Sequence, residues 1–301
     1  MTMPALYDTF KRYRTLQTHT ISALPVVILM PHSACNCRCV MCDIWKDNKN
    51  LKQLTEQDVE ALMSSLKAFG TRQVAMSGGE ALLNSNFFKL CEILKYAGIS
   101  VTLLTTGLTV KRNTENLLRW VDEVIVSLDG DEPLHDAIRN VPGVFKKLKE
   151  GVEHIKSLNP NYRITARTVI HRLNFRNWES IISEAQKMGI DQISFLPADV
   201  SSHAFNRQMA WEEPKQDEIL ISKNELPELM ETITRIIDNH GDFTSGFIAE
   251  SPEKISQAER PAINRLIACW FSGPRSGTAD SGQSNRSGFA ASALSDSSRT
   301  C

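Results

Sequence analysis

Strand-like and helix-like segments alternate between residues 26 and 196, and this alternation limits how the chain can fold more than any other feature. The predicted strands are the short apolar runs 26–30, 73–77, 100–105, 123–128, 163–170 and 192–196. Amphipathic segments that predict helices follow the first five strands, at 55–69, 86–96, 113–120, 144–158 and 178–188. Repeated β-α units with short connections imply parallel strands with the helices packed outside them. The pattern predicts an α/β fold, and it leaves open a full barrel, a partial barrel and a doubly wound sheet.

The composition changes along the chain and predicts four regions. They are an N-terminal extension at 1–24, a core of β-α units at 25–210, a short helical C-terminal extension at 211–268, and a Ser/Gly-rich tail at 269–301. Nine serines, four glycines and a single large aliphatic residue, Leu294, fall between Phe271 and Cys301. Because such a segment cannot bury a core, we expect it to be disordered. The abrupt shift near Trp270 favours a truncated or altered C-terminal end.

Charge and hydropathy limit the kinds of partner. A formal net charge of -1 provides no overall field for nucleic acid or an anionic membrane. No stretch approaches the roughly 20 apolar residues that cross a bilayer. The apolar run at 21–30, followed by Cys35, loosely resembles a lipoprotein signal, but Pro25 and Pro31 interrupt or close it. We expect a cytoplasmic protein that binds neither nucleic acid nor membrane.

Four of the seven cysteines, Cys35, Cys37, Cys39 and Cys42, lie within eight residues, just after the first predicted strand. Thiols this close together do not suit a framework of scattered disulfides, and they indicate metal binding or redox chemistry. A structural zinc site normally takes two pairs of ligands, and no second C-x-x-C or H-x-x-x-H pair is present. Three thiolates on one loop suit a cubane iron–sulfur cluster that keeps one iron open. Zinc stays the alternative metal, and Cys37 stays an alternative ligand.

The spacing C-x3-C-x2-C, formed by Cys35, Cys39 and Cys42, resembles the cluster-binding loop of the radical S-adenosylmethionine superfamily. The resemblance implies that these three cysteines hold a [4Fe–4S] cluster whose fourth iron binds S-adenosylmethionine. It also implies an oxidoreductase-like, oxygen-sensitive enzyme that receives electrons from a reductant such as a flavodoxin or ferredoxin. Reductive cleavage of the cofactor would then give a 5'-deoxyadenosyl radical that abstracts hydrogen from a substrate.

Residues at later strand ends extend the resemblance. Gly78, Gly79 and Glu80 follow the second strand and are similar to the family's Gly-Gly-Glu motif, which receives the amino group of the cofactor's methionine. Ser127, at the end of the fourth strand, resembles a residue that contacts the cofactor, and Arg139 resembles an arginine that pairs with its carboxylate. An arginine suits that task because its planar fork grips a carboxylate with two hydrogen bonds.

Two further positions are less typical of the family. Thr106 lies where members often carry asparagine, within Thr105-Thr106-Gly107 at the end of the third strand. Arg167 alternates with apolar neighbours in the fifth strand, and we expect its side chain to face the interior of the barrel near the cofactor or the substrate.

These observations predict a partial (β/α)6 TIM-like barrel that carries out radical chemistry. Relatives often continue into a SPASM/twitch-type domain with cysteines for auxiliary clusters, whereas here only Cys269 and Cys301 follow the core. The substrate is expected to be a small molecule or a peptide, in peptide or protein maturation or in cofactor biosynthesis. The alternatives are a non-catalytic metal-binding protein and an inactive, truncated homologue.

Overall fold

The computed structural model describes residues 3–200 and 209–256 of the chain. Six parallel strands form one sheet in sequence order, from β1 at one edge to β6 at the other. The strands are β1 (Val26–His32), β2 (Gln73–Gly78), β3 (Ser100–Thr105), β4 (Glu123–Ser127), β5 (Arg163–Ile170) and β6 (Gln192–Pro197). Since β1 and β6 are not neighbours, the sheet is a partial barrel, as predicted, and not a closed one.

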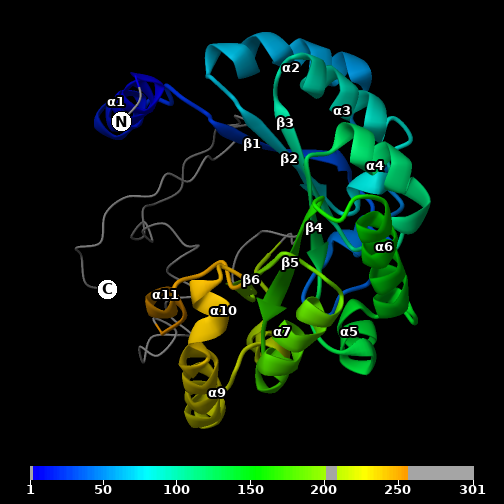
Figure 1. The fold of residues 1–301 in the computed structure, drawn as a ribbon, viewed down its shortest axis with the longest axis vertical. Helices are drawn as coiled ribbons and strands as arrows, with labels where there is room; N and C mark the ends of the chain where they lie inside the picture. Colours follow the sequence, from blue (N-terminus) through cyan, green and yellow to red (C-terminus); the bar gives the residue numbers. More distant parts are fainter. Residues whose placement is uncertain (1–2, 201–208, 257–301) are drawn as a thin grey trace, which may run out of the picture.

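Helices cover one side of the curved sheet, and Figure 1 shows most of them along its outer side. The helices of the β-α units are α2 (Glu56–Ala68), α3 (Phe87–Tyr96), α4 (Thr114–Trp120), α5 (Glu132–Arg139), α6 (Val144–Leu158) and α7 (Trp178–Lys187). The others are α1 (Met3–Thr18), α8 (Glu213–Ile219), α9 (Leu226–Asp238), α10 (His240–Thr244) and α11 (Pro252–Ser256). Short 3-10 turns lie at Ile44–Asp47, Ala81–Leu83, Lys111–Asn113, Phe175–Asn177 and Lys223–Glu225.

The two faces of the sheet differ in chemistry. On the helix side, alternate strand residues such as Val74, Leu103 and Val124 are fully buried and join one large apolar core. On the inner side, the register aligns Ser127 of β4 with Arg167 of β5, and Arg167 with Ser194 of β6. Because successive side chains of a strand point to opposite faces, the inner surface of the partial barrel carries polar groups.

All six strands begin at the residue that the hydrophobic pattern predicts. The helices α5 and α8 lie in segments for which no helix is predicted. Both are short, with only eight and seven residues, and each has a proline in its first turn. The predicted disordered tail and Cys269 lie outside the residues that the structure describes.

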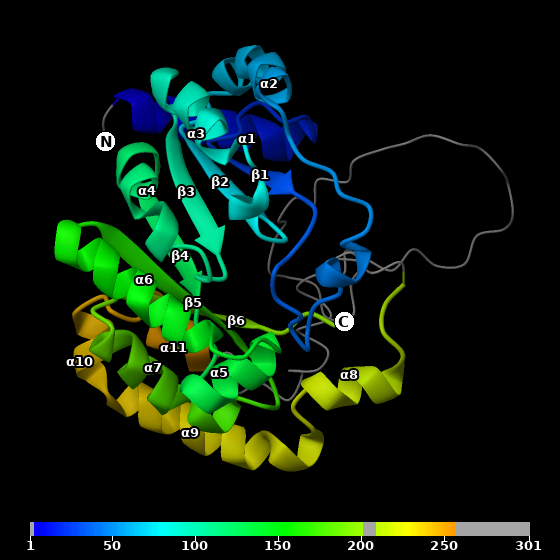
Figure 2. The same cartoon turned by 90° about the vertical axis from the view of Figure 1, so that its right-hand side faces the viewer.

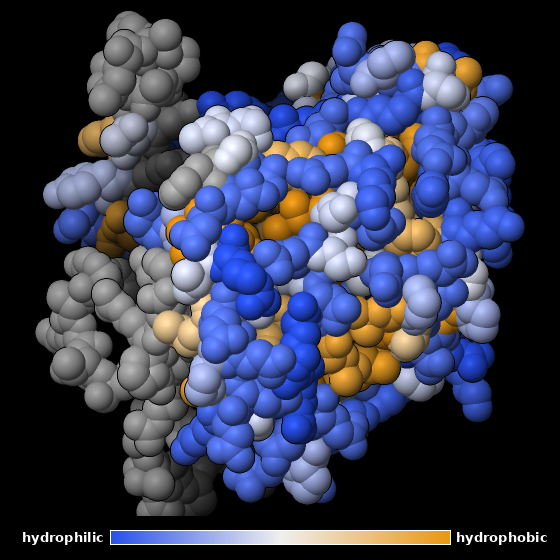
Figure 3. Space-filling view, turned by 60° about the horizontal axis from the view of Figure 1, so that its bottom comes forward, coloured by the Kyte–Doolittle hydropathy of each residue, from blue (hydrophilic) through white to orange (hydrophobic). Residues whose placement is uncertain are grey.

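In the described parts of the chain, 3–200 and 209–256, no helix has the length and apolar character needed to span a membrane. On the face shown in Figure 3, hydrophilic side chains predominate and apolar ones form separate patches between them.

Candidate iron–sulfur site

The loop that carries the cysteines follows β1 and is held by two other parts of the fold. Figure 2 shows the chain after β1 running down toward the end of α5. There the backbone N–H groups of Arg38 and Val40 donate to the carbonyls of Arg139 and Ile138, each at 3.0 Å. The last carbonyls of a helix have no partner within the helix, so the loop satisfies two of them at the end of α5. On the other side, the N–H of Glu80 donates to the carbonyl of Ala34 at 2.8 Å.

The four cysteines of the loop differ in burial. Cys37 is fully buried and Cys39 is 8% exposed, whereas Cys35 and Cys42 are half-buried. Cys37, Cys39 and Met41 belong to a small apolar cluster, against which Cys35 and Cys42 pack. All four thiols thus lie at one apolar cluster, Cys37 and Cys39 as members of it and Cys35 and Cys42 packed against it.

Electrostatics favour a thiolate at Cys39. A hydrogen bond from Cys37 lowers the pKa of Cys39 to about 6 against the opposing effect of burial, and the charge of Arg139 adds to the lowering. Burial raises the pKa of Cys35 to about 12, and the nearby Cys39, Glu80 and Cys42 contribute to the rise. Since a metal binds the thiolate, Cys39 is readier than Cys35 to bind one.

The donor set of the loop fits an iron–sulfur cluster, because the three motif cysteines lie on one segment and thiolates are the usual ligands of such clusters. Among the described residues, no group of three His, Cys, Asp or Glu side chains is arranged to hold a single metal ion. Arg139 also keeps a buried Nε–H without a partner in the described residues, as a site that accepts a further group can.

The Gly-Gly-Glu segment packs directly on the cysteine loop. A Cβ atom at Gly79 would lie 2.1 Å from the carbonyl oxygen of Ala34, so only glycine fits there. Gly78 has φ +111°, a conformation that side-chain-bearing residues rarely adopt. Gly79 is thus required by the approach of one backbone to another, and Gly78 by its own backbone conformation. Their predicted contact with the cofactor stays a prediction.

Glu80 is fully buried and links β2 to β3. Its carboxylate accepts hydrogen bonds from the N–H of Leu82 at 3.2 Å, from the Thr105 hydroxyl at 2.9 Å, and from the N–H and hydroxyl of Thr106 at 2.8 and 2.7 Å. The unusual Thr106 therefore has a defined role, because its hydroxyl supplies one of these bonds. The role of Glu80 toward the methionine amino group stays a prediction.

We expect Glu80→Gln to lower the free energy of unfolding of the cluster-free protein by about 2 kcal/mol, because an amide leaves a buried N–H donor without an acceptor. Denaturant unfolding measures the change. The control is Glu60→Gln on the exposed side of α2, which we expect to have little effect. Equal stability of the Glu80 and Glu60 variants would contradict a structural role for this carboxylate.

Arg139 lies at the end of α5, 8% exposed, between Asp129 and Cys39. Its Nη2 forms an ion pair of 2.5 Å with Oδ2 of the fully buried Asp129, and its Nη1 donates to Sγ of Cys39 at 3.6 Å. Asp129 raises the pKa of Arg139, with help from Cys39 and Cys37, although burial opposes the rise. Arg139, the predicted cofactor ligand, is therefore already paired with a carboxylate and with a cysteine of the predicted cluster site.

Ser127 ends β4 on the inner face, beside Arg167. The expected inward orientation of Arg167 agrees with this register, because its neighbours Ala166 and Thr168 are buried on the other face. Its Nε is buried and lacks a hydrogen-bond partner within the described residues. Ser127 thus lies at the predicted strand end, and its contact with the cofactor stays a prediction.

Two buried histidines lie near this ion pair. Burial, with the charge of Arg139, lowers the pKa of His135 to about 4, and burial likewise lowers the pKa of His171 to about 4. The Nδ1 of His135 accepts from the N–H of Asp129 at 3.1 Å, and the Nδ1 of His171 accepts from the N–H of Leu173 at 3.2 Å. Both rings are therefore neutral in the folded protein at pH 7.

We expect the protein to lose stability as the pH falls from about 6.5 to about 4. The unfolded state, with an ordinary histidine pKa of about 6.5, binds protons in this range that the folded state does not. At pH 5 the loss relative to pH 8 is about 2 kcal/mol for each histidine. His135→Asn, which keeps an acceptor for Asp129, should remove about half of the loss in denaturant titrations. An unchanged pH dependence in this variant would contradict the assignment.

A later segment covers the cysteine loop. Trp211 is 8% exposed, belongs to the same apolar cluster as Cys37 and Cys39, and donates from Nε1 to Oδ2 of Asp43 at 2.6 Å. The region around α8 is thus attached to the loop across 168 positions of sequence.

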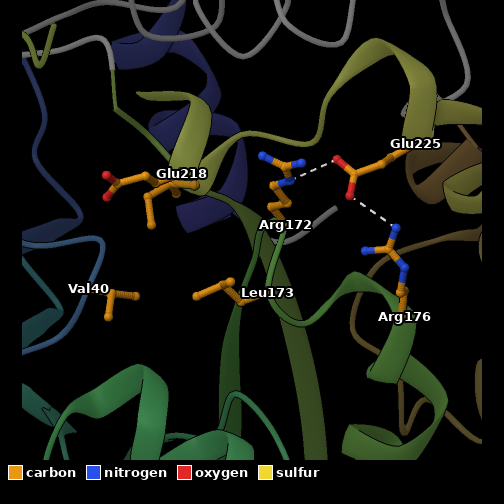
Figure 4. A pocket seen from close by; sticks show the side chains of 7 residues that line it. Val40, Arg172, Leu173, Arg176, Glu218 and Glu225 are labelled. Carbon is orange, nitrogen blue, oxygen red and sulfur yellow. Dashed lines mark hydrogen bonds and ion pairs between the residues drawn. The ribbon is translucent and has the colours of Figure 1, made fainter. Parts of the chain in front are cut away.

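An open pocket of about 580 Å³ lies where α8, the residues after β5 and the cysteine loop meet. Figure 4 shows Val40 of the loop and Leu173 on one side, and Arg172 and Arg176 both directed at Glu225. The two ion pairs to Glu225 measure 3.0 Å each. A molecule in this pocket would touch the loop at Val40, between two of the predicted cluster ligands.

The sequence pattern did not identify Asp129, Trp211 or His135 as parts of the site. Asp129 follows a predicted strand within a Ser-Leu-Asp-Gly turn, a composition that is common in loops. Only its pairing with Arg139 in three dimensions distinguishes it.

The chain is similar to several known proteins. A family model described as the Radical SAM superfamily matches residues 29–196. The Fe-coproporphyrin III synthase of Methanosarcina barkeri is 27% identical over 247 residues, which span 77% of this chain and 61% of that protein. The sporulation killing factor maturation protein of Bacillus subtilis is 26% identical over 172 residues, covering 56% of this chain and 41% of that protein.

A solved structure has a similar fold. The crystal structure of Streptococcus suis SuiB bound to the precursor peptide SuiA aligns with a TM-score of 0.59 at 15% sequence identity, covering 76% of this chain and 49% of that chain. At this identity the likeness concerns the fold alone. The chain thus spans about four to six tenths of the length of these relatives.

Proposed function

The chain belongs to the radical SAM superfamily, and on that premise we propose that it is an enzyme that cleaves S-adenosylmethionine reductively at a [4Fe–4S] cluster held by Cys35, Cys39 and Cys42. When bound, the cluster supplies the electron that splits the sulfonium into methionine and a 5'-deoxyadenosyl radical, which then abstracts hydrogen from the substrate. The electron comes from a reductant such as a flavodoxin or ferredoxin. The observation that carries the proposal is one loop with three motif cysteines, bordered by the Gly-Gly-Glu segment and by Arg139.

The residues of the chain would prepare this reaction by positioning. Gly79 allows the Gly-Gly-Glu segment to pack on Ala34, and the buried Glu80 fixes the segment to the end of β3. Backbone groups of the segment and Ser127 on the inner face are proposed to bind the cofactor. The polar inner surface around Arg167 would face the substrate. We place the protein in the cytoplasm, where an oxygen-sensitive cluster is better protected than outside the cell.

The test is anaerobic reconstitution with iron and sulfide, followed by incubation with S-adenosylmethionine and dithionite. We expect a brown protein with about four irons and four sulfides per chain, and 5'-deoxyadenosine as a product. The matched control is the same incubation with protein that has not been reconstituted. Zinc without sulfide would contradict the proposal and favour a non-catalytic metal-binding protein. An intact cluster that never yields 5'-deoxyadenosine would contradict it and favour an inactive homologue.

For the substrate we propose a peptide or a cofactor precursor. The relatives support both classes, because one carries the name of a coproporphyrin synthase and another that of a peptide maturation protein. A true substrate is expected to raise the yield of 5'-deoxyadenosine above that of the substrate-free reaction and to gain or lose mass. Candidate peptides and porphyrins that leave both quantities unchanged are excluded one by one.

A further inference from the structure

We propose that Arg139, held in place by Asp129, acts on the cluster through Cys39 and raises its reduction potential. The inference rests on the proposed function, since it needs the cluster that Cys35, Cys39 and Cys42 would hold. It gives Arg139 a different task from the one that family resemblance implies, which is to bind the carboxylate of S-adenosylmethionine. The geometry points to a residue that sets how readily the cluster accepts an electron.

The first support is the direct contact between Arg139 and a predicted ligand. Nη1 of Arg139 donates to Sγ of Cys39 at 3.6 Å, and the contact is buried. A hydrogen bond from a charged donor is stronger than one between neutral groups. Hydrogen bonds to the ligand sulfurs are among the features with which a protein adjusts an iron–sulfur potential.

The second support is that the guanidinium is fixed from two directions. Its Nη2 pairs with Asp129 at 2.5 Å, and Oδ1 of Asp129 in turn accepts from the N–H of Val169 at 3.0 Å. The backbone of Arg139 accepts from the N–H of Arg38, the residue that precedes Cys39. Independent contacts therefore hold the Arg139 side chain and the Cys39 sulfur next to each other.

The third support is the sign of the charge. Reduction adds one electron to a cluster that already carries three thiolates, so a nearby positive charge stabilises the reduced state more than the oxidised one. The guanidinium contacts the sulfur directly, while the carboxylate of Asp129 pairs with Nη2, so the positive group is the one in contact with Cys39. Burial keeps solvent ions from screening this effect.

Arg38 provides a matched control within the same loop. It lies next to Cys39 in sequence, but its side chain is exposed. Removing the charge of Arg38 leaves the buried contact between Arg139 and Cys39 intact. Because the Arg38 side chain is exposed, water and salt already screen its effect on the cluster. Arg139→Gln and Arg38→Gln therefore make the same chemical change, in a buried and in an exposed position.

The experiment measures two quantities on the reconstituted full chain, the midpoint potential by EPR-monitored redox titration and the Kd of S-adenosylmethionine for the oxidised protein. For Arg139→Gln we expect the reduced cluster to become about tenfold less favoured, which is a midpoint lower by about 59 mV for a one-electron couple. We expect a Kd within about twofold of the wild type, which is less than about 0.4 kcal/mol. Arg38→Gln should match the wild type in both quantities.

Arg139→Gln leaves Asp129 buried without its partner, so this variant can fail to fold. A second variant keeps the inference testable in that case. Asp129→Asn combined with Arg139→Gln removes both charges, and we expect a smaller fall of the potential in the same direction. An unchanged potential with weakened cofactor binding would overturn the inference and assign Arg139 to the cofactor carboxylate. A wild-type protein that forms no cluster or no 5'-deoxyadenosine would instead refute the proposed function.

Discussion

Replacement of Cys39 by alanine is expected to abolish cluster assembly, whereas replacement of Cys37 by alanine is expected to preserve it. Cys39 is held toward the thiolate form by Cys37 and Arg139, and the thiolate is the form that binds iron. The thiol of Cys37 is fully buried, and its hydrogen bond to Cys39 raises the pKa of Cys37. Cys37 therefore acts as a hydrogen-bond donor to Cys39, and the C-x3-C-x2-C spacing does not include it.

Iron and sulfide per chain after anaerobic reconstitution measure this difference, with about four of each expected for the wild type and for Cys37→Ala. The Cys39→Ala protein should hold no intact cubane and form no 5'-deoxyadenosine. The control is Cys91→Ala, which removes another fully buried thiol from α3 without touching the loop. If Cys37→Ala lost the cluster and Cys39→Ala kept it, Cys37 would be the ligand.

Gly79→Ala is expected to damage both the fold and the site. The new Cβ would lie 2.1 Å from the carbonyl oxygen of Ala34, well inside van der Waals contact, and both partners are backbone. Neither can move away as a flexible side chain would, so the cysteine loop and the Gly-Gly-Glu segment must separate. We expect a loss of about 3 kcal/mol in the free energy of unfolding, together with poor retention of the cluster.

Gly241→Ala is the matched control for this change. At Gly241 the nearest atom to a new Cβ is Oδ1 of Asn239, at an ordinary distance of 3.7 Å. Denaturant unfolding of the cluster-free proteins separates the effect on the fold from the effect on the cluster. Wild-type stability in Gly79→Ala would show that the loop and the segment are not in the contact described above.

The sheet could be predicted from the sequence because its information is local. Each strand is a short apolar run, and each main helix has an apolar face that repeats with the helical period. The cap of α2 is equally local, since Thr55 and Asp58 bond to each other within one turn. The cysteines could be placed at the site because residues just after parallel strands gather at one edge of the sheet.

The partnerships within the site could not be predicted in this way. Asp129, Arg139 and Cys39 come from three different segments, and nothing in their spacing shows that they meet. The same holds for Glu80 and Thr106, which are 26 residues apart. The resemblance to a family suggested that Glu80 and Arg139 face a cofactor. The structure adds that both are also bound to neighbouring parts of the chain.

The attachment of the cysteine loop to the end of α5 has a consequence for metal loading. The amides of Arg38 and Val40 have their carbonyl partners at the end of α5, so the fold itself holds this part of the loop. Small zinc domains, by contrast, fold only when their metal binds. A loop held in this way needs less of the free energy of metal binding to order its backbone, and more of that free energy remains to hold the metal.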